Sequence, residues 1–145
     1  MGSDDWYRNR RWDSETERAF DARLARSRSQ KAQYLRIQGS ILKETHPEAA
    51  IGLLRRCIDE GDSFHVAHAH LDTAHAHYVL GDVDSALASL EAAIDQEERE
   101  PMFRTSAPFD FAFLAALHGR TERYGKALAL LDPQEGLALF ASMRF

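Results

Sequence analysis

Histidine is the side chain in this sequence whose clustering best suggests chemistry. The chain has seven histidines, and five of them lie close together (His65, His68, His70, His75 and His77). Ligands that share a metal ion on one helix stand three or four residues apart, and His68, Asp72 and His75 have this spacing. In the alternative interpretation His70 and His77 pack against a neighbouring helix, while His68 and His75 line a binding surface. We favour the alternative, so we expect no metal or other cofactor.

The other candidates for catalysis are isolated residues. The sequence has no glycine-rich phosphate loop, no His-Glu-x-x-His and no Gly-x-Ser-x-Gly. Cys57, the single cysteine, lies in an apolar stripe, which predicts a packed thiol rather than a nucleophile. His118 and Arg120 have the chemistry to polarise a phosphate, but cations near a helix end commonly interact with the helix dipole alone. We therefore predict no catalytic residues and a protein that is not an enzyme.

Aromatic and basic side chains alternate near the N-terminus, in the stretch Trp6-Tyr7-Arg8-Asn9-Arg10-Arg11-Trp12. Such a segment can stack on nucleic-acid bases and pair with phosphates. It can equally fold back, with Trp6 and Trp12 as anchors on the first helices. We favour the fold-back, because the sequence that follows is mixed in charge rather than uniformly basic.

Charge and length narrow the class of protein. The 145 residues suit one domain, and we divide them into an N-terminal arm (1–13) and a single helical domain (14–145). Residues 1–36 are slightly basic, but the rest is acidic enough to give a net charge of -5, which disfavours general nucleic-acid binding. With no long apolar run and a polar N-terminus, we expect no membrane association and a cytoplasmic protein.

The apolar pattern predicts an all-α fold. Apolar residues recur every three or four positions, and strand-like alternation is nearly absent. A capping box at Ser14–Glu17 opens the first expected helix, and further helices cover about 31–44, 64–80 and 109–117. The other helices follow turns at 45–47, 81–82, 119–121 and 132–133. This gives about eight short helices.

Three helical hairpins share a pattern of alanines. Ala50, Ala86 and Ala127 each begin the apolar stripe of a second helix, and they lie 36 and 41 residues apart. The best-defined unit is 67–100, with Ala74, Gly81-Asp82, Ala86, Leu90 and Ala93 at small, turn and large positions. In this pattern the chain resembles the tetratricopeptide repeat family over about 31–132. The resemblance implies a right-handed superhelix of about three hairpins with capping helices at both ends.

The resemblance also implies a function. Members of the family bind extended peptides or partner helices in the concave groove formed by the first helix of each hairpin. The positions that correspond to this groove are Leu35, Leu42, Lys43, His68, Leu71, Asp72, His75, Tyr78 and Phe109. They lack the Lys, Asn and Arg set with which some members hold a carboxylate tail. We therefore expect a protein-binding adaptor, chaperone or toxin-neutralising module of bacterial type. Its apolar groove should bind the partner more weakly as the histidines protonate below about pH 6.5.

Self-association is the alternative that we keep open. Leu139, Phe140, Met143 and Phe145 give the C-terminal helix an apolar face, and an array that ends in an uncovered apolar face can pair with a second copy. A homodimeric scaffold would use this end rather than the groove. Metal or nucleic-acid binding through the histidines or the basic arm is a third and weaker alternative.

Overall fold

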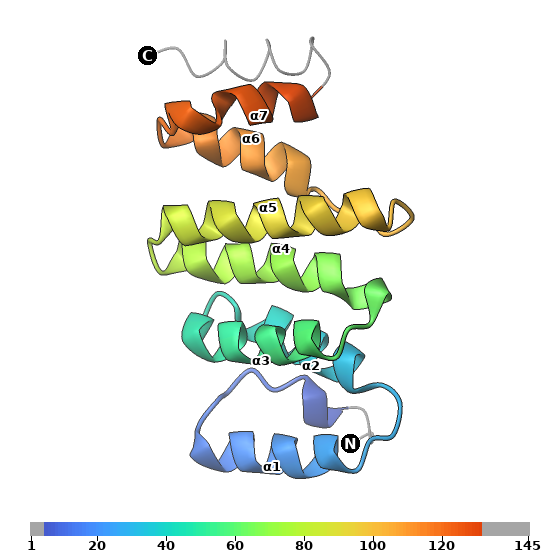
Figure 1. Ribbon diagram of the computed structural model, residues 1–145. Coiled ribbons are helices and arrows are strands. Elements are labelled where there is room, and N and C mark those ends of the chain that lie inside the picture. Colours follow the sequence, from blue (N-terminus) through green and yellow to red (C-terminus); the bar gives the residue numbers. More distant parts are fainter. Residues whose placement is uncertain (1–4, 132–145) are drawn as a thin grey trace.

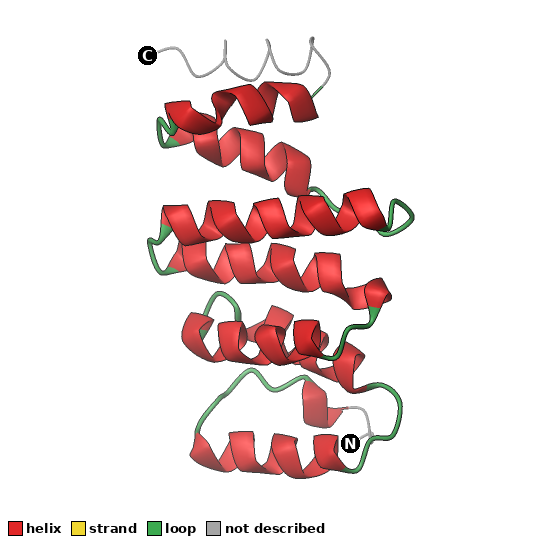
Figure 2. Cartoon of the chain, in the orientation of Figure 1, coloured by secondary structure: helices red, strands yellow, loops and turns green. Residues whose placement is uncertain are grey.

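The computed structural model describes residues 5–131 and shows an all-helical chain. Within these residues there is no strand (Figure 2). The 3-10 helices are η1 (Asp5–Tyr7) and η2 (Thr121–Arg123). The α-helices are α1 (Ser14–Ala25), α2 (Lys31–Leu42), α3 (Pro47–Asp59), α4 (Ser63–Val79), α5 (Val83–Arg99), α6 (Ala107–Leu117) and α7 (Tyr124–Leu130). The predicted all-α fold is confirmed.

The helices pair in chain order and the pairs stack in one direction. Neighbouring contacts join α2 to α3, α4 to α5 and α6 to α7, while α3 packs on α4 and α5 on α6 (Figure 1). The first helices of the first two pairs, α2 and α4, also touch each other. Helix α1 and the N-terminal segment cover one end of the stack (Figure 1).

Two of the predicted turns have the same local geometry. At the end of α4, Gly81 has a φ of 80°, and Asp82 N–H donates to the carbonyl of His77. At the end of α6, Gly119 has a φ of 65°, and Arg120 N–H donates to the carbonyl of Ala115. Both are Schellman turns, which need the left-handed backbone that glycine adopts most easily. They reverse the chain tightly enough for the two helices of a pair to lie side by side.

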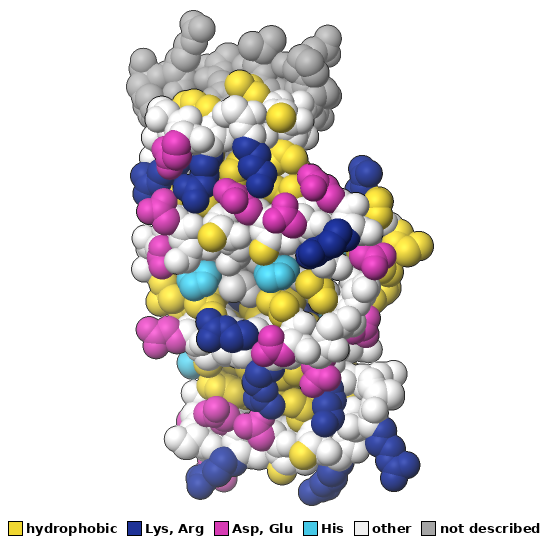
Figure 3. Space-filling model, in the orientation of Figure 1, with side chains coloured by type: hydrophobic (Ala, Val, Ile, Leu, Met, Phe, Trp, Pro, Cys, Tyr) yellow, Lys and Arg dark blue, Asp and Glu magenta, His cyan; other side chains and the backbone are white. Residues whose placement is uncertain are grey.

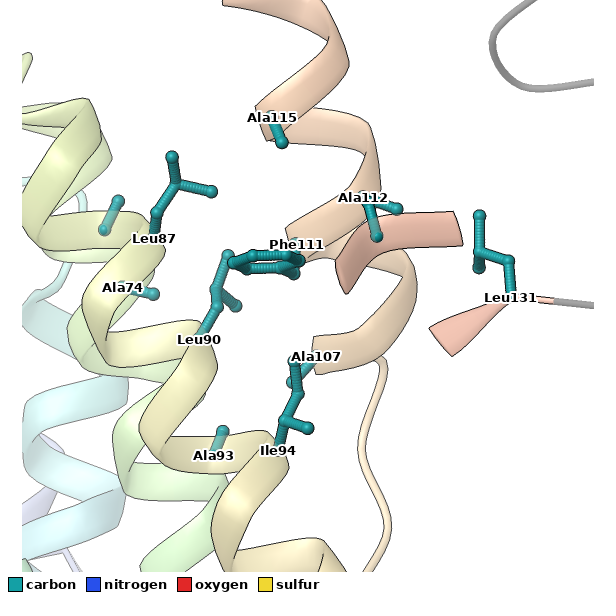
Figure 4. Packing of buried hydrophobic residues seen from close by; sticks show 12 residues of the cluster. Ala74, Leu87, Leu90, Ala93, Ile94, Ala107, Phe111, Ala112, Ala115 and Leu131 are labelled. Carbon is teal, nitrogen blue, oxygen red and sulfur yellow. The ribbon is translucent and has the colours of Figure 1, made fainter. Parts of the chain in front are cut away.

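Within residues 5–131, buried apolar side chains form two clusters rather than one. The α5–α6 core joins α4 to α7 and comprises Ala74, Ala86, Leu87, Leu90, Ala93, Ile94, Ala107, Phe111, Ala112, Ala115, Ala127 and Leu131. Figure 4 shows the Phe111 ring lying beside Leu90, with small alanines around it. The α2–α3 core comprises Tyr7, Phe20, Leu24, Ala32, Leu35, Leu42, Ala50, Leu53, Leu54, Cys57, Ala69 and Ala76. Alanines at the crossings let the helices approach closely.

Surface ion pairs connect α5 to the segment that contains η2 and α7. On the face shown in Figure 3, acidic and basic side chains are interspersed along the stack. Arg120 lies 3.0 Å from Asp84, and Arg123 lies 3.1 Å from Glu91 on α5. These pairs are partly exposed, so each contributes little to stability. They fix the position of the segment that contains η2 and α7 against α5.

The aromatic N-terminal segment folds back onto the first helices. The ring of Trp6 lies 5.5 Å from that of Phe20 on α1 and 4.8 Å from that of Tyr34 on α2. The backbone and side-chain N–H groups of Asn9 both donate to the buried Gln38 Oε1 at 2.9 Å. Asn9 supplies these hydrogen bonds of Gln38, so the N-terminal segment packs on the first helices as the fold-back interpretation predicts.

The start of α1 differs by one residue from the predicted capping box. Asp13, not Ser14, is the N-cap, and its carboxylate accepts the backbone N–H of Thr16 at 2.8 Å. The Trp12 ring just before it lies 5.6 Å from Phe20. Asp and Ser are about equally good N-caps, so the one-residue difference does not change the chemistry of the cap.

Candidate functional site

A pocket of about 350 Å³ opens between α4 and α6. Its walls come from the two facing helices, with the end of α2 and one residue of α5 completing them. The lining residues are Lys43, Leu71, Asp72, Ala74, His75, Tyr78, Leu90, Ser106, Asp110, Phe113 and Leu114. The volume lies in the range of pockets that take small ligands or single anchoring side chains. This pocket is the candidate functional site.

The exposed wall of the pocket is largely apolar. Phe113 on α6 keeps 39% of its surface exposed, and Tyr78 on α4 also keeps 39%. Phe109, one turn before Phe113, is 52% exposed and stacks on it with ring planes 19° apart. Below them Leu71 and Leu114 pack against the α5–α6 core. Such an uncovered aromatic and aliphatic surface is typical of a docking site.

An ion pair forms one side of the pocket. Lys43 Nζ, just after α2, lies 2.9 Å from Asp72 Oδ1 on α4, and the two side chains are only 22% and 12% exposed. Water is largely excluded from this pair, so removal of either charge would leave the other poorly solvated and lower the stability of the fold. The pair links α2 to α4 and leaves this side of the pocket close to neutral.

Two hydrogen-bonded pairs mark the ends of the pocket. Tyr78 Oη and His118 Nε2, at the C-terminal ends of α4 and α6, are 3.1 Å apart and bridge the two helices. At the other end of α6, Ser106 Oγ donates to Asp110 Oδ2 at 2.7 Å. The Asp110 carboxylate remains partly exposed beside the apolar wall. The pocket is therefore bounded along its length by defined polar groups.

Five of the nine predicted groove residues line this pocket, namely Lys43, Leu71, Asp72, His75 and Tyr78. Leu35 and Leu42 do not, and their assignment to a binding surface is wrong. They are 1% and 0% exposed, because α3 and α4 cover the apolar stripe of α2. His68 is partly buried on α4 and does not line the pocket, and Phe109 lies beside it. The predicted self-association residues Leu139, Phe140, Met143 and Phe145 lie outside the described residues.

On α6 the sequence predicts only Phe109 at the binding surface and does not find Asp110, Phe113 and Leu114, although the repeat spacing gives a signal for them. Ala115 lies 41 residues after Ala74, the same spacing that separates Ala127 from Ala86. The same spacing of 41 residues relates His65 and Asp72 on α4 to Ser106 and Phe113. On α4 these two residues contact side chains of α2, the first helix of the preceding pair. The side of α6 that faces α4 follows from that correspondence. The concave positions of each helix, taken alone, do not include this side of α6.

The histidines of α4 lie in different structural environments. His65 is buried, and its Nδ1 accepts the Nε–H of Arg36 at 2.8 Å. Burial lowers the pKa of His65, and the Arg36 charge lowers it further. Burial likewise lowers the pKa of His70, with a smaller contribution from Arg99. His75 Nε2 lies 3.4 Å from Glu44 Oε1 at the rim of the pocket.

The structure does not assemble the suggested metal stripe. Among the residues that it describes, no three His, Cys, Asp or Glu side chains are arranged to hold an ion. Asp72, the middle member of the stripe, is paired with Lys43 instead. Cys57 is fully buried, and burial raises the pKa of its thiol to about 12, which agrees with a packed residue.

Two further hollows are poorer candidates. One lies beside the N-terminal segment and is lined largely by polar and charged side chains, among them Arg11, Asp13 and Arg23. The other lies between the end of α5 and the loop that follows it, where buried Glu97 accepts the N–H of Thr105. Neither presents the exposed aromatic wall of the α4–α6 pocket.

No protein-family model, curated protein or solved structure matches the chain. None of the helices between residues 5 and 131 combines the length and apolar character needed to cross a bilayer. We therefore infer function from the pocket's own residues.

Proposed function

We propose that this chain is a non-catalytic protein-interaction module that binds a partner segment in the α4–α6 pocket. The observation that carries the proposal is the uncovered wall of Phe113, Tyr78 and Phe109 on the stack of helices. Polar groups at the pocket are engaged with each other, whereas the exposed surface is mainly apolar. This division favours docking of a protein surface over chemistry on a small substrate.

We also propose that the three helical pairs are degenerate tetratricopeptide-like repeats. The alanine spacing, the glycine turns and the contact between α2 and α4 support this interpretation. In such an array the pocket lies between consecutive first helices, which is where a groove for a partner segment would run. An adaptor, chaperone or toxin-neutralising role is compatible with this surface, and a cytoplasmic location remains part of the proposal.

A native pull-down tests whether the pocket is the working surface. Wild-type protein is used as bait beside a Phe113→Glu/His75→Glu variant, which places two carboxylates on exposed parts of the pocket. Leu128→Glu on α7 is the matched control, because Leu128 is 49% exposed and does not line the pocket. Circular dichroism and thermal melting confirm that all three baits are folded.

We expect wild type and Leu128→Glu to recover the same stoichiometric protein and the pocket variant to lose it. Recovery of that protein by all three baits would place the binding surface elsewhere. Recovery of no protein by any of them would contradict the proposed function.

A further inference from the structure

We propose that the segment bound in the α4–α6 pocket is an amphipathic helix that carries a large apolar residue flanked by Arg or Lys. This inference rests on the proposed function and adds the chemical class of the partner. Its three elements are the helical form, the apolar anchor and the positive charge. Each follows from a different property of the pocket.

The helical form follows from what the pocket lacks. Its eleven lining residues include no Asn or Gln, the side chains that best pair with the backbone of an extended peptide. Most of the lining residues lie within helices, whose interior backbone groups are already hydrogen-bonded, and the part of the chain that the structure describes offers no sheet edge. A partner whose own backbone is hydrogen-bonded internally loses least on docking.

The apolar anchor follows from the aromatic wall. Phe113 is exposed and stacks on the ring of Phe109, while Leu114, the next residue on α6, packs against the α5–α6 core. Leu71 on α4 and Leu90 on α5 line the same pocket. A leucine or aromatic side chain on one face of a helix would fill this space and cover the exposed rings.

The positive charge follows from the balance of charges at the pocket. The one cationic side chain in the lining, Lys43, is paired with Asp72 at 2.9 Å. The remaining carboxylates are those of Asp110, whose partner is the neutral hydroxyl of Ser106, and Glu44, which lies at the rim beside His75. The pocket and rim are therefore negative, and the faces of Phe113 and Tyr78 also attract cations. An Arg or Lys beside the anchor complements this surface.

Selection from a random helical peptide library tests the inference directly. The library displays a scaffolded helix with all residue types at its surface positions, and it is selected against folded wild-type protein. Selected peptides are synthesised, and fluorescence anisotropy gives their Kd for wild type, for Phe113→Glu and for Asp110→Asn/Glu44→Gln. Asp95→Asn, an exposed carboxylate on α5 outside the pocket lining, is the control for loss of net charge.

We expect the selected peptides to share an apolar anchor with Arg or Lys one turn away and to lose binding to Phe113→Glu. Replacing the flanking Arg by Gln, or using Asp110→Asn/Glu44→Gln, should weaken binding about fivefold, as loss of a partly exposed ion pair does. Asp95→Asn should change the Kd less than twofold.

Other results would overturn the inference in distinguishable ways. Neutral or acidic peptides that still lose binding to Phe113→Glu would refute the charge preference and leave the proposed function intact. Selected peptides that bind Phe113→Glu as well as wild type would refute both the partner class and the pocket as the binding surface. An empty selection together with a partner in the pull-down would refute the helical form alone.

Discussion

At the scale of single residues, the absence of a side chain is as informative as its presence. Gly39 on α2 is buried where Leu54 of α3 crosses it, and a Cβ built at Gly39 would lie 2.7 Å from Leu54 Cγ. Leu54 itself is fully buried, so it cannot turn away into solvent without exposing apolar surface. The close approach of α2 and α3 depends on this one glycine.

Gly39→Ala should destabilise the protein, although alanine is the better helix former. Overpacking at a tight site costs about 1–3 kcal/mol, and the gain in helix propensity returns about 1 kcal/mol, so we expect a net loss of about 1 kcal/mol. Urea denaturation measures the free energy of unfolding.

The matched control is Gly52→Ala on α3, where a new Cβ meets no atom within 4 Å. This variant should gain about 1 kcal/mol from helix propensity alone. Equal stabilisation by the two substitutions would show that Leu54 yields and that the crossing is not tight.

At the scale of helices, the Lys43–Asp72 pair is the link that positions α2 against α4 beside the pocket. Lys43 follows the last residue of α2, and Asp72 lies in the middle of α4. Both side chains are mostly buried, so the energetic value of the pair differs from that of the more exposed Arg120–Asp84 and Arg123–Glu91 pairs.

Lys43→Met should destabilise the protein by about 2 kcal/mol at pH 7, because Asp72 then keeps a poorly solvated charge without its partner. Lys43→Met/Asp72→Leu should recover most of that loss, since no unpaired charge remains. Chemical denaturation of wild type, both single variants and the double variant gives the coupling free energy. Additive losses in the two single variants would mean that the pair is solvated like a surface pair.

The sequence predicts the helices better than it predicts their faces. The turns at Gly81 and Gly119 and the bounds of α2 and α4 are local properties, set by caps, glycines and periodicity. Which stripe stays exposed depends on how the helices roll against each other, a property of the assembled stack. Leu35 and Leu42 were therefore placed wrongly, and Asp110 and Phe113 were missed, although the helices that carry them were expected.

At the scale of the whole molecule, stability should depend on two histidines in the middle of the stack. His65 and His70 both lie on α4, and burial lowers the pKa of each in the folded state. In the unfolded chain a histidine has a pKa of about 6.5. Below that pH the unfolded state binds more protons than the folded state, so acid favours unfolding.

We expect the free energy of unfolding to be highest above about pH 7 and to fall as the pH drops through 6.5 toward 5. A His65→Phe/His70→Phe variant should show a shallower fall over this range, whatever its stability at pH 7. Urea titrations between pH 5 and 8 measure both slopes. Parallel slopes for the two proteins would contradict the assignment and point to other groups.

Helix α4 also connects the N-terminal half of the chain, which contains the α2–α3 core, to the C-terminal half, which contains the α5–α6 core. It contributes Ala74 to the α5–α6 core and Ala69 and Ala76 to the α2–α3 core. The buried α4 members of both cores are thus alanines, with Leu71 packed against the α5–α6 core beside them. Cooperativity of unfolding depends on the connection through α4, because each half has its own apolar interior. A ligand that spans α4 and α6 therefore stiffens the C-terminal half directly, and its effect reaches the N-terminal half through these alanines, the Lys43–Asp72 pair and the Arg36–His65 hydrogen bond.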